Sequence, residues 1–223
     1  MLDFNDPTIR ALIEGKGWEA LAIKERLLSI YNYVRDEIKF GYNKADDIPA
    51  SQVLLDGYGQ CNTKSILLMA LLRALDIPCR IHGFTIDKAL QKGAMTSFVY
   101  GLSPASILHS WVEVLYQGRW LDLEGVILDK PYIESLQRHF PDCPKEFCGY
   151  GVATKDLSCP KIEWNEDSTY IQKEGINGDL GLFDSPDDLF GRHRQKLNPI
   201  KRLAFETIGR SMMNSNIRKI RGN

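Results

Sequence analysis

The chain has no apolar run long enough to cross a bilayer, and no basic patch followed by an apolar stretch opens it. It also lacks an excess of charge of either sign. Its 28 Lys and Arg residues face 29 Asp and Glu residues, a formal net charge of −1, which argues against general binding to nucleic acid or other polyanions. The 223 residues suit one domain or a domain with a large appendage. We therefore expect a cytoplasmic protein without a membrane span.

The five cysteines are an odd number at irregular spacing, so the sequence contains no disulfide framework. In a chain without an export signal we expect reduced thiols. Cys143, Cys148 and Cys159 raise the question of a zinc site, but their spacing is loose and no histidine follows Cys148 closely enough to complete a usual ligand set. We expect no metal and no cofactor, and we expect Cys79 to pack in the core.

Hydrophobic periodicity predicts helices combined with an antiparallel sheet. Apolar residues at helical spacing indicate helices over 18–40, 50–55, 61–75, 131–140 and from 185 onward. Alternating patterns indicate strands over 79–84, 107–116 and 119–123, with a turn at Gln117-Gly118 between the last two. Residues 141–176 are expected to be irregular and 175–181 to form a loop. The segment 61–75 is apolar almost all round, which predicts a buried helix.

Cys61 opens this buried helix, directly after the loop Asp56-Gly57-Tyr58-Gly59-Gln60. A helix N-terminus carries partial positive charge and unpaired N–H groups, which favour a thiolate and suit an oxyanion. A cysteine at such a position is more often a small core residue, so position alone decides little. His109 in a strand and Asp122 after a turn add a base and an orienting acid. The three residues together make a complete set for thiol catalysis.

The geometry of the predicted hairpin bears on which carboxylate orients the histidine. A two-residue turn places Glu113 opposite Asp122, so His109 and Asp122 share a face but are offset by about 13 Å at the rise of a strand. A bulge, a wider turn or strong twist would have to close that gap. Glu124 falls nearer to His109 in the simple register and is the second candidate for the orienting acid.

The sequence does not decide the roles of other residues near these three. Trp111 and Trp120 share a face with His109, and we favour packing beside the site over a wall for the substrate side chain. The candidates for a side-chain oxyanion donor, or for lining the site, offer no basis for a choice among them: Gln52, Tyr58 and Gln60.

Several of these segments together resemble the core motif of the transglutaminase-like superfamily of cysteine proteins. They are Gly59-Gln60-Cys61, the helix ending in Leu71-Leu72-Arg73-Ala74-Leu75-Asp76-Ile77-Pro78-Cys79-Arg80, His109-Ser110-Trp111-Val112-Glu113-Val114, and Arg119-Trp120-Leu121-Asp122. The resemblance implies an α+β, papain-like core in which a buried helix bearing the cysteine packs on an antiparallel sheet. It implies Cys61 as nucleophile, His109 as base and acid, and Asp122 as orienter. We expect residues 1–130 to form this core with N-terminal helices, and 131–223 an irregular and helical extension packed on it.

The resemblance implies acyl transfer through a thioester, from an amide or isopeptide bond of a peptide or protein to water or an amine, with no metal or organic cofactor. We expect hydrolysis, as by a protease or amidase, rather than cross-linking. Two other classes stay open. One is a non-catalytic transglutaminase-like binding module that uses the same cleft. The other is an interaction protein that works through its C-terminal segment.

That C-terminal segment is basic. Between Arg192 and Arg221, Glu206 is the sole carboxylate among many Lys and Arg residues. A solvated helix face explains such a pattern, as does pairing with the acidic residues that precede it. A sharper interpretation is contact with an acidic partner, anionic lipid or nucleic acid. No aromatic residues alternate with the basic ones in the way single-stranded nucleic acid binding requires, so nucleic acid is disfavoured.

Overall fold

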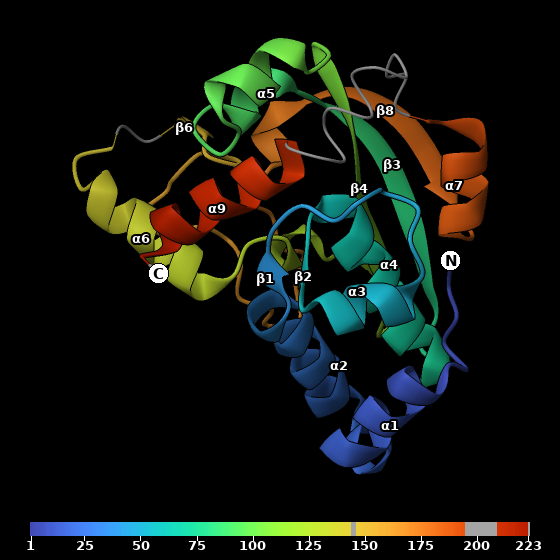
Figure 1. Ribbon diagram of the computed structural model, residues 1–223. Helices are drawn as coiled ribbons and strands as arrows, with labels where there is room; N and C mark the ends of the chain where they lie inside the picture. The colour runs from blue at the N-terminus through green and yellow to red at the C-terminus, as the bar shows by residue number, and fades with distance from the viewer. Residues whose placement is uncertain (144–145, 195–208, 223) are drawn as a thin grey trace.

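The computed structural model describes residues 1–143, 146–194 and 209–222 and has a mixed α+β architecture (Figure 1). Its main sheet is antiparallel, with four strands in the order β5-β4-β3-β8. The bounds are β3 (Cys79–Asp87), β4 (Ser106–Tyr116), β5 (Arg119–Asp122) and β8 (Ile176–Phe183). Two further strand pairs join β1 (Lys39–Phe40) to β2 (Tyr58–Gly59) and β6 (Phe147–Gly149) to β7 (Val152–Thr154). The α+β class expected from the sequence is confirmed.

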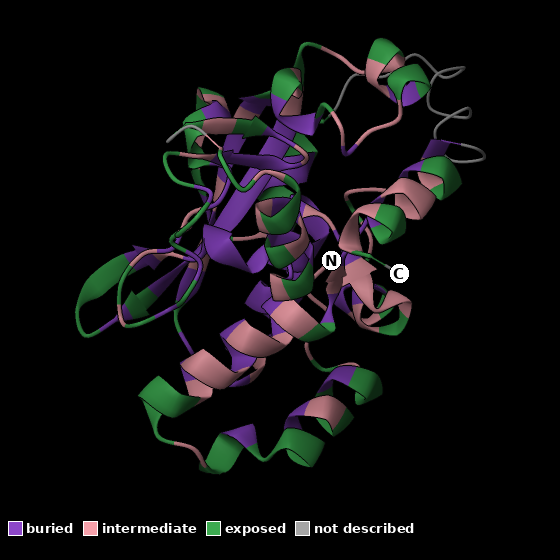
Figure 2. Ribbon diagram, turned by 90° about the vertical axis from the view of Figure 1, so that its left-hand side faces the viewer, coloured by how far each residue is buried: buried purple, intermediate pink, exposed green. Residues whose placement is uncertain are grey.

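The helices surround this sheet and cover its core face. They are α1 (Pro7–Lys16), α2 (Ile23–Asn32), α3 (Ala50–Asp56), α4 (Cys61–Ala74), α5 (Ser97–Leu102), α6 (Lys130–His139), α7 (Pro186–Arg192) and α9 (Arg210–Arg221). Short helical turns are η1 (Trp18–Ala20), η2 (Tyr33–Glu37), η3 (Lys88–Gln91), η4 (Glu124–Val126) and η5 (Lys173–Gly175). Figure 2 shows buried residues concentrated in the main sheet, while the peripheral helices carry most of the exposed ones.

Helix α4 forms the centre of the hydrophobic core, packed against β3 and β4. Its residues from Ile66 to Leu72 are all buried, as the apolar run predicts. The inward residues Leu108, Val112 and Val114 of β4 belong to the same core cluster. Each fully buried aliphatic side chain of this kind stabilises the fold by roughly 1.5–3 kcal/mol. The core therefore fixes the position of α4 relative to β4.

The connection from α3 into α4 is short and sharply bent. Gly57 ends α3 in the left-handed conformation, with φ of 69°, where a residue without Cβ is favoured. Strand β2 follows, and the backbone N–H of Gln60 donates to the Thr63 hydroxyl at 3.1 Å to begin α4. As a result Cys61 is the first residue of the helix, as expected.

The helix expected over 18–40 is divided in the structure into η1, α2 and η2, and its last two residues form strand β1 instead. The break between η1 and α2 is stabilised by Arg26, whose guanidinium donates to the carbonyls of Trp18 at 2.9 Å and Leu21 at 3.0 Å. These bonds satisfy carbonyl groups that a continuous helix would have used internally. Apolar periodicity did not reveal this break because the residues keep the same buried stripe on either side of it.

Strand β8 corrects the expectation of a loop over 175–181. It pairs with β3 at the edge of the main sheet, with register shifts between Gly83 and Phe84 and between Thr85 and Ile86. These irregularities, and Gly181 with φ of 92°, remove the strict alternation by which strands are recognised. The segment expected to be irregular, 141–176, contains β6 and β7. The division of the chain at residue 130 stays a prediction, although β8 belongs to the core sheet.

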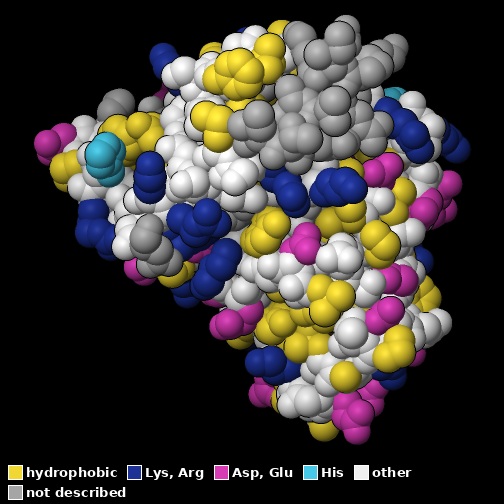
Figure 3. All heavy atoms as spheres, in the orientation of Figure 1, with side chains coloured by type: hydrophobic (Ala, Val, Ile, Leu, Met, Phe, Trp, Pro, Cys, Tyr) yellow, Lys and Arg dark blue, Asp and Glu magenta, His cyan; other side chains and the backbone are white. Residues whose placement is uncertain are grey.

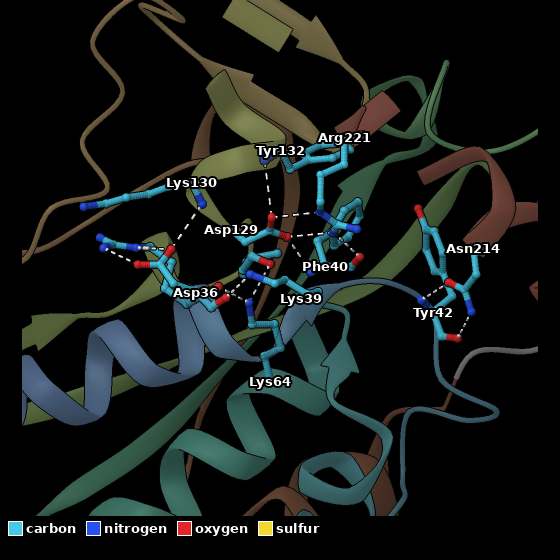
Figure 4. Close-up of polar contacts among 12 residues, drawn as sticks. Asp36, Lys39, Phe40, Tyr42, Lys64, Asp129, Lys130, Tyr132, Asn214 and Arg221 are labelled. Atoms are coloured by element: carbon cyan, nitrogen blue, oxygen red, sulfur yellow. Dashed lines mark hydrogen bonds and ion pairs between the residues drawn. The ribbon is translucent and has the colours of Figure 1, made fainter. Parts of the chain in front are cut away.

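Helix α9 is held to the rest of the fold by side-chain hydrogen bonds (Figure 4). The Arg221 guanidinium donates to both oxygens of the buried Asp129 carboxylate, at 2.9 and 2.7 Å, and to the Phe40 carbonyl at 2.8 Å. Asn214 donates to the Tyr42 carbonyl at 3.0 Å and accepts from the Tyr42 N–H at 2.7 Å. Arg221, one member of the basic segment, therefore has a structural partner inside the protein.

The other basic residues of this segment differ in position. Arg218 and Lys219 are exposed on α9, and Figure 3 shows basic side chains gathered over α6 and α9. Lys196, Lys201 and Arg202 lie outside the described residues. An acidic partner for this surface stays a prediction. Within the part of the chain that the structure describes, no helix has both the length and the apolar character to cross a membrane.

Replacing Arg221 by alanine is expected to lower the free energy of unfolding by about 3 kcal/mol, because it leaves the fully buried carboxylate of Asp129 without its cation. Urea denaturation measures the change. The control is Arg218→Ala on the exposed side of the same helix, where we expect a change within about 0.5 kcal/mol. Equal small losses in both variants would contradict the structural role given to the Arg221–Asp129 pair.

Candidate active site

Cys61 lies at the start of α4 and lines a cavity of about 270 Å³. The residue is 8% exposed, so its side chain is largely enclosed but borders open space. The first backbone N–H groups of α4 have no acceptor within the helix. A thiol in this position therefore meets both a reachable volume and the positive end of a helix.

The first turn of α4 is bonded to β4 on both sides of His109. The Asn62 amide donates to the Leu108 carbonyl at 3.2 Å and accepts from the Ser110 hydroxyl at 3.0 Å. Both partners are direct neighbours of His109 in the chain. These two bonds fix the distance between the cysteine-bearing helix and the histidine-bearing strand.

The His109 ring is fully buried between Cys61 and Glu124. Its Nε2 lies 2.9 Å from Oε1 of Glu124. Nδ1 has no geometrically aligned hydrogen-bond partner among the described residues, but the Cys61 side chain lies close enough to affect the pKa of the ring. Burial alone would lower the pKa of His109, but the charge of Cys61 and the bond to Glu124 outweigh it and raise that pKa to about 9. The site therefore favours an imidazolium at neutral pH.

Glu124 is itself buried and fully bonded. Its second oxygen accepts from the backbone N–H groups of Ile171 at 2.9 Å and Gln172 at 3.0 Å. The next residue, Gly125, is packed so tightly that a Cβ there would lie 2.3 Å from the Tyr31 hydroxyl. A side chain at position 125 would push η4 away from this contact. The carboxylate thus has one fixed orientation, with one oxygen on His109.

Asp122 does not occupy the place expected for it. It pairs with Glu113 in the register predicted for the hairpin, so no irregularity brings it closer to His109. Its two carboxylate oxygens accept from the Trp111 indole N–H, at 3.2 Å, and from the Tyr170 hydroxyl. Glu124, the second candidate, makes the contact with His109 that was expected of Asp122.

Trp111 packs beside the site rather than in the cavity. It is buried, and its ring meets the His109 ring edge to face, with centroids 5.9 Å apart. Trp120 is 40% exposed and lies under the Arg80 guanidinium, 4.0 Å from the ring centroid. The geometry supports the packing interpretation for Trp111, which reaches the histidine but not the described wall of the cavity.

Of the three candidates for a side-chain oxyanion donor, Gln60 alone lines the cavity in the described structure. Its amide already bonds the neighbouring loop, accepting from the Asn43 N–H at 2.9 Å and donating to Asp46 at 3.0 Å. Gln52 is exposed on α3 and donates to Asp56 at 2.7 Å. Tyr58 lies in β2. The role of an oxyanion donor stays a prediction for these side chains.

Two residues of the cavity carried no signal in the sequence. Tyr42 and Gln91 both line it, and the Tyr42 hydroxyl donates to Oε1 of Gln91 at 2.7 Å. Burial and the nearby charge of Cys61 raise the pKa of Tyr42, so its hydroxyl keeps its proton. These residues come from separate segments, and neither belongs to a recognisable motif. Their convergence on Cys61 depends on the folded chain.

The other four cysteines do not line the described cavity. All five are free thiols, and burial raises the pKa of Cys79 to about 11. Among the described residues, no group of three or more His, Cys, Asp or Glu side chains comes together in a way suited to a metal ion.

Comparison with known proteins identifies the family of this chain. The model of the transglutaminase-like superfamily matches residues 11–125, just over half of the chain. A solved structure of a proposed cysteine protease from Cytophaga hutchinsonii is similar with 13% identity and a TM-score of 0.42, over 81% of this chain and 45% of that one. The chain thus spans less than half of that protein, and the likeness carries no argument about activity. No curated protein sequence matches. By the family match, which includes Cys61, His109 and Glu124, the chain belongs to the transglutaminase-like superfamily.

Proposed function

We propose that this chain is a thiol-dependent hydrolase of amide or isopeptide bonds that acts through Cys61, His109 and Glu124. Membership in the superfamily supports a cysteine-dependent enzyme in general terms. The observation that carries the finer proposal is the buried His109 ring, set between the Cys61 side chain and the Glu124 carboxylate. A histidine this strongly perturbed, next to a cysteine that lines a cavity, is typical of catalysis.

The reaction begins with a proton held on His109, leaving Cys61 as the thiolate. The sulfur attacks the carbonyl carbon of the substrate amide, and the carbonyl electrons move to oxygen. The first backbone N–H groups of α4 stabilise this oxyanion. When the tetrahedral intermediate collapses, the carbon–nitrogen bond breaks and His109 gives its proton to the leaving amine. The enzyme then holds the acyl group as a thioester on Cys61.

Water completes the reaction. Neutral His109 takes a proton from water, whose oxygen attacks the thioester carbonyl, and the carbon–sulfur bond breaks to release the carboxylic acid and restore the thiolate–imidazolium pair. Glu124 keeps Nε2 protonated throughout, so that Nδ1 is the nitrogen that exchanges protons with Cys61 and the substrate. General acid–base catalysis of this kind contributes roughly a hundredfold to ten-thousandfold.

We expect iodoacetamide at pH 6.5 to alkylate Cys61 faster than the other four thiols. Cys148 is exposed, but burial of its sulfur and the nearby Asp87 raise the pKa of its thiol, so exposure alone gives little thiolate there. Peptide mapping by mass spectrometry follows each site. Alkylation that simply follows exposure, with Cys148 and Cys159 reacting first, would argue for a non-catalytic binding module.

Replacing Glu124 by glutamine is expected to lower the pKa of His109 from about 9 to below about 8, because the substitution removes a negative charge that favours the imidazolium. NMR titration of the histidine side chains measures it. Asp122→Asn is the matched control, since its carboxylate bonds Trp111 and Tyr170 instead. If Asp122→Asn moved the titration and Glu124→Gln did not, Asp122 would be the orienting acid.

Hydrolysis and transfer to an amine differ in the product. With a set of N-acetyl amino acid 4-nitroanilides, we expect release of 4-nitroaniline that is lost in Cys61→Ala. In water enriched in oxygen-18, with free lysine present, the acyl product is expected to carry the label as a carboxylic acid. A lysine amide as the main product would show that the reaction is transamidation and not hydrolysis. Failure to cleave any of the amides would contradict the proposed enzymatic activity.

A further inference from the structure

Helix α9 brings a residue from the far end of the sequence to the cavity of Cys61. Met213 of α9 is fully buried and lines the same cavity as Cys61. Helix α9 lies beyond the segment that matches the family, which ends at residue 125. The wall that Met213 forms is therefore a feature of this chain's own C-terminal part.

The same helix also fixes a second part of the cavity lining by completing an open strand edge. Strand β1 and the residues after it turn one edge toward β2, where the N–H groups of Lys39 and Gly41 donate to the carbonyls of Gly57 at 3.0 Å and Gly59 at 3.1 Å. By the alternation of a strand, the backbone groups of Phe40 and Tyr42 point the other way.

Side chains occupy that other edge in place of a strand (Figure 4). Asn214 bonds both backbone groups of Tyr42, at 2.7 and 3.0 Å. Asp129 accepts from the Phe40 N–H at 2.8 Å, and Arg221 donates to the Phe40 carbonyl at 2.8 Å. Both Phe40 and Tyr42 line the cavity. Helix α9 thus contributes one wall directly and holds the backbone of another.

The buried lining of this cavity is apolar or neutral. Its apolar members include Phe40, Val99 and Met213. Its buried polar members are uncharged: the amides of Asn43, Asn62, Gln91 and Gln172 and the hydroxyl of Tyr42. The charged residues that line it are exposed or half-buried and of both signs: Lys44, Asp46, Asp47 and Arg194. A charged group placed against the buried lining would lose its hydration without gaining an ion pair.

The size of the cavity limits what fits. Its volume of about 270 Å³ compares with roughly 150 Å³ for an apolar protein cavity that binds benzene. There is room for one aromatic or long aliphatic side chain together with a short stretch of its backbone. A whole folded partner does not fit, whereas a single residue of an extended segment does.

We propose that this cavity is the acyl-side specificity pocket of the enzyme, that it accepts an uncharged apolar side chain of leucine, methionine or phenylalanine size next to the scissile carbonyl, and that Met213 of α9 forms its wall. The proposal rests on the proposed function of Cys61. It assigns the substrate class as peptides or acylated amines with a large apolar residue on the acyl side of the cleaved bond.

The test uses N-acetyl aminoacyl chloromethyl ketones that differ only in their side chain, with leucine, phenylalanine, glutamate and lysine forms. The Cys61 sulfur displaces chloride to form a thioether, and intact-mass spectrometry gives the second-order rate. We expect the leucine and phenylalanine reagents to react at least about tenfold faster than the glutamate and lysine reagents in the wild-type full-length protein. Equal rates, or faster reaction of a charged reagent, would overturn the pocket assignment.

Variants of α9 test its part in the pocket. Met213→Ala enlarges the cavity and is expected to raise the phenylalanine-to-leucine rate ratio several-fold. Met212→Ala is the control, because Met212 is exposed on the same helix and lines no part of the described cavity. If Met213→Ala does not fold, Met213→Leu, which keeps most of the volume, is expected to retain the wild-type order of rates. An unchanged ratio in Met213→Ala would remove α9 from the pocket.

Failure of the proposed function gives a different result. Iodoacetamide, which needs no pocket, reports whether Cys61 is reactive at all. Fast alkylation by iodoacetamide with no preference among the ketones overturns the pocket and leaves the nucleophile in place. No preferential reaction of Cys61 with iodoacetamide or with any ketone overturns the proposed function. A uniform rise in all four ketone rates in Asn214→Ala would show that α9 blocks the cavity, which also overturns its assignment as a specificity wall.

Discussion

The first turn of α4 carries polar side chains that are buried. The arrangement of the site depends on the hydrogen bonds that these side chains form. An unpartnered buried polar group costs roughly 1–3 kcal/mol, yet every polar side chain here has a partner in a different segment. Asn62 and Ser65 bond backbone groups of β4, Thr63 bonds Asn43, and Lys64 donates to the carbonyls of Arg35 at 3.0 Å and Ile127 at 3.1 Å. Moving the helix would break several of these bonds together, so the sulfur of Cys61 is held in place relative to the His109 ring.

Glu124 is held beside the His109 ring by different means. The hairpin keeps the register that its two-residue turn predicts, and Asp122 therefore stays opposite Glu113. Glu124 reaches the ring because the chain leaves the sheet at η4, where the Glu124 N–H donates to the Thr169 carbonyl at 3.2 Å and its carboxylate accepts from Ile171 and Gln172. Simple register geometry pointed to Glu124 as the nearer acid. The backbone donors that orient it come from a segment some 47 residues later. No local sequence pattern predicts such a contact.

Prediction from the sequence succeeded where one local pattern decides the structure and failed where distant segments meet. The buried helix α4, the hairpin of β4 and β5, and helix α6 follow from apolar spacing and turn residues. Strand β8 was missed because it is an edge strand whose irregular register hides alternation. A C-terminal helical extension packed on the core was expected, but the contacts that dock α9 were not, because they depend on Asn214 and Arg221, polar residues whose partners lie more than 90 residues away. Tyr42 and Gln91 were not predicted to line the cavity for the same reason, because distant segments bring them there.

These long-range contacts mean that the family-matched half of the chain does not contain the whole lining of the cavity that Cys61 borders. Lys64, in α4, lies near Asp129, and burial lowers the pKa of Lys64 to about 7. Burial alone would raise the pKa of Asp129, but its bonds to Arg221 outweigh that effect and keep the carboxylate ionised. Asp129 also holds the N–H of Phe40 beside the cavity. Without α9 the buried Asp129 carboxylate would lose its ion pair with Arg221 where α4 and the wall of the cavity meet (Figure 4). The arrangement around the first turn of α4 therefore depends on the docking of α9.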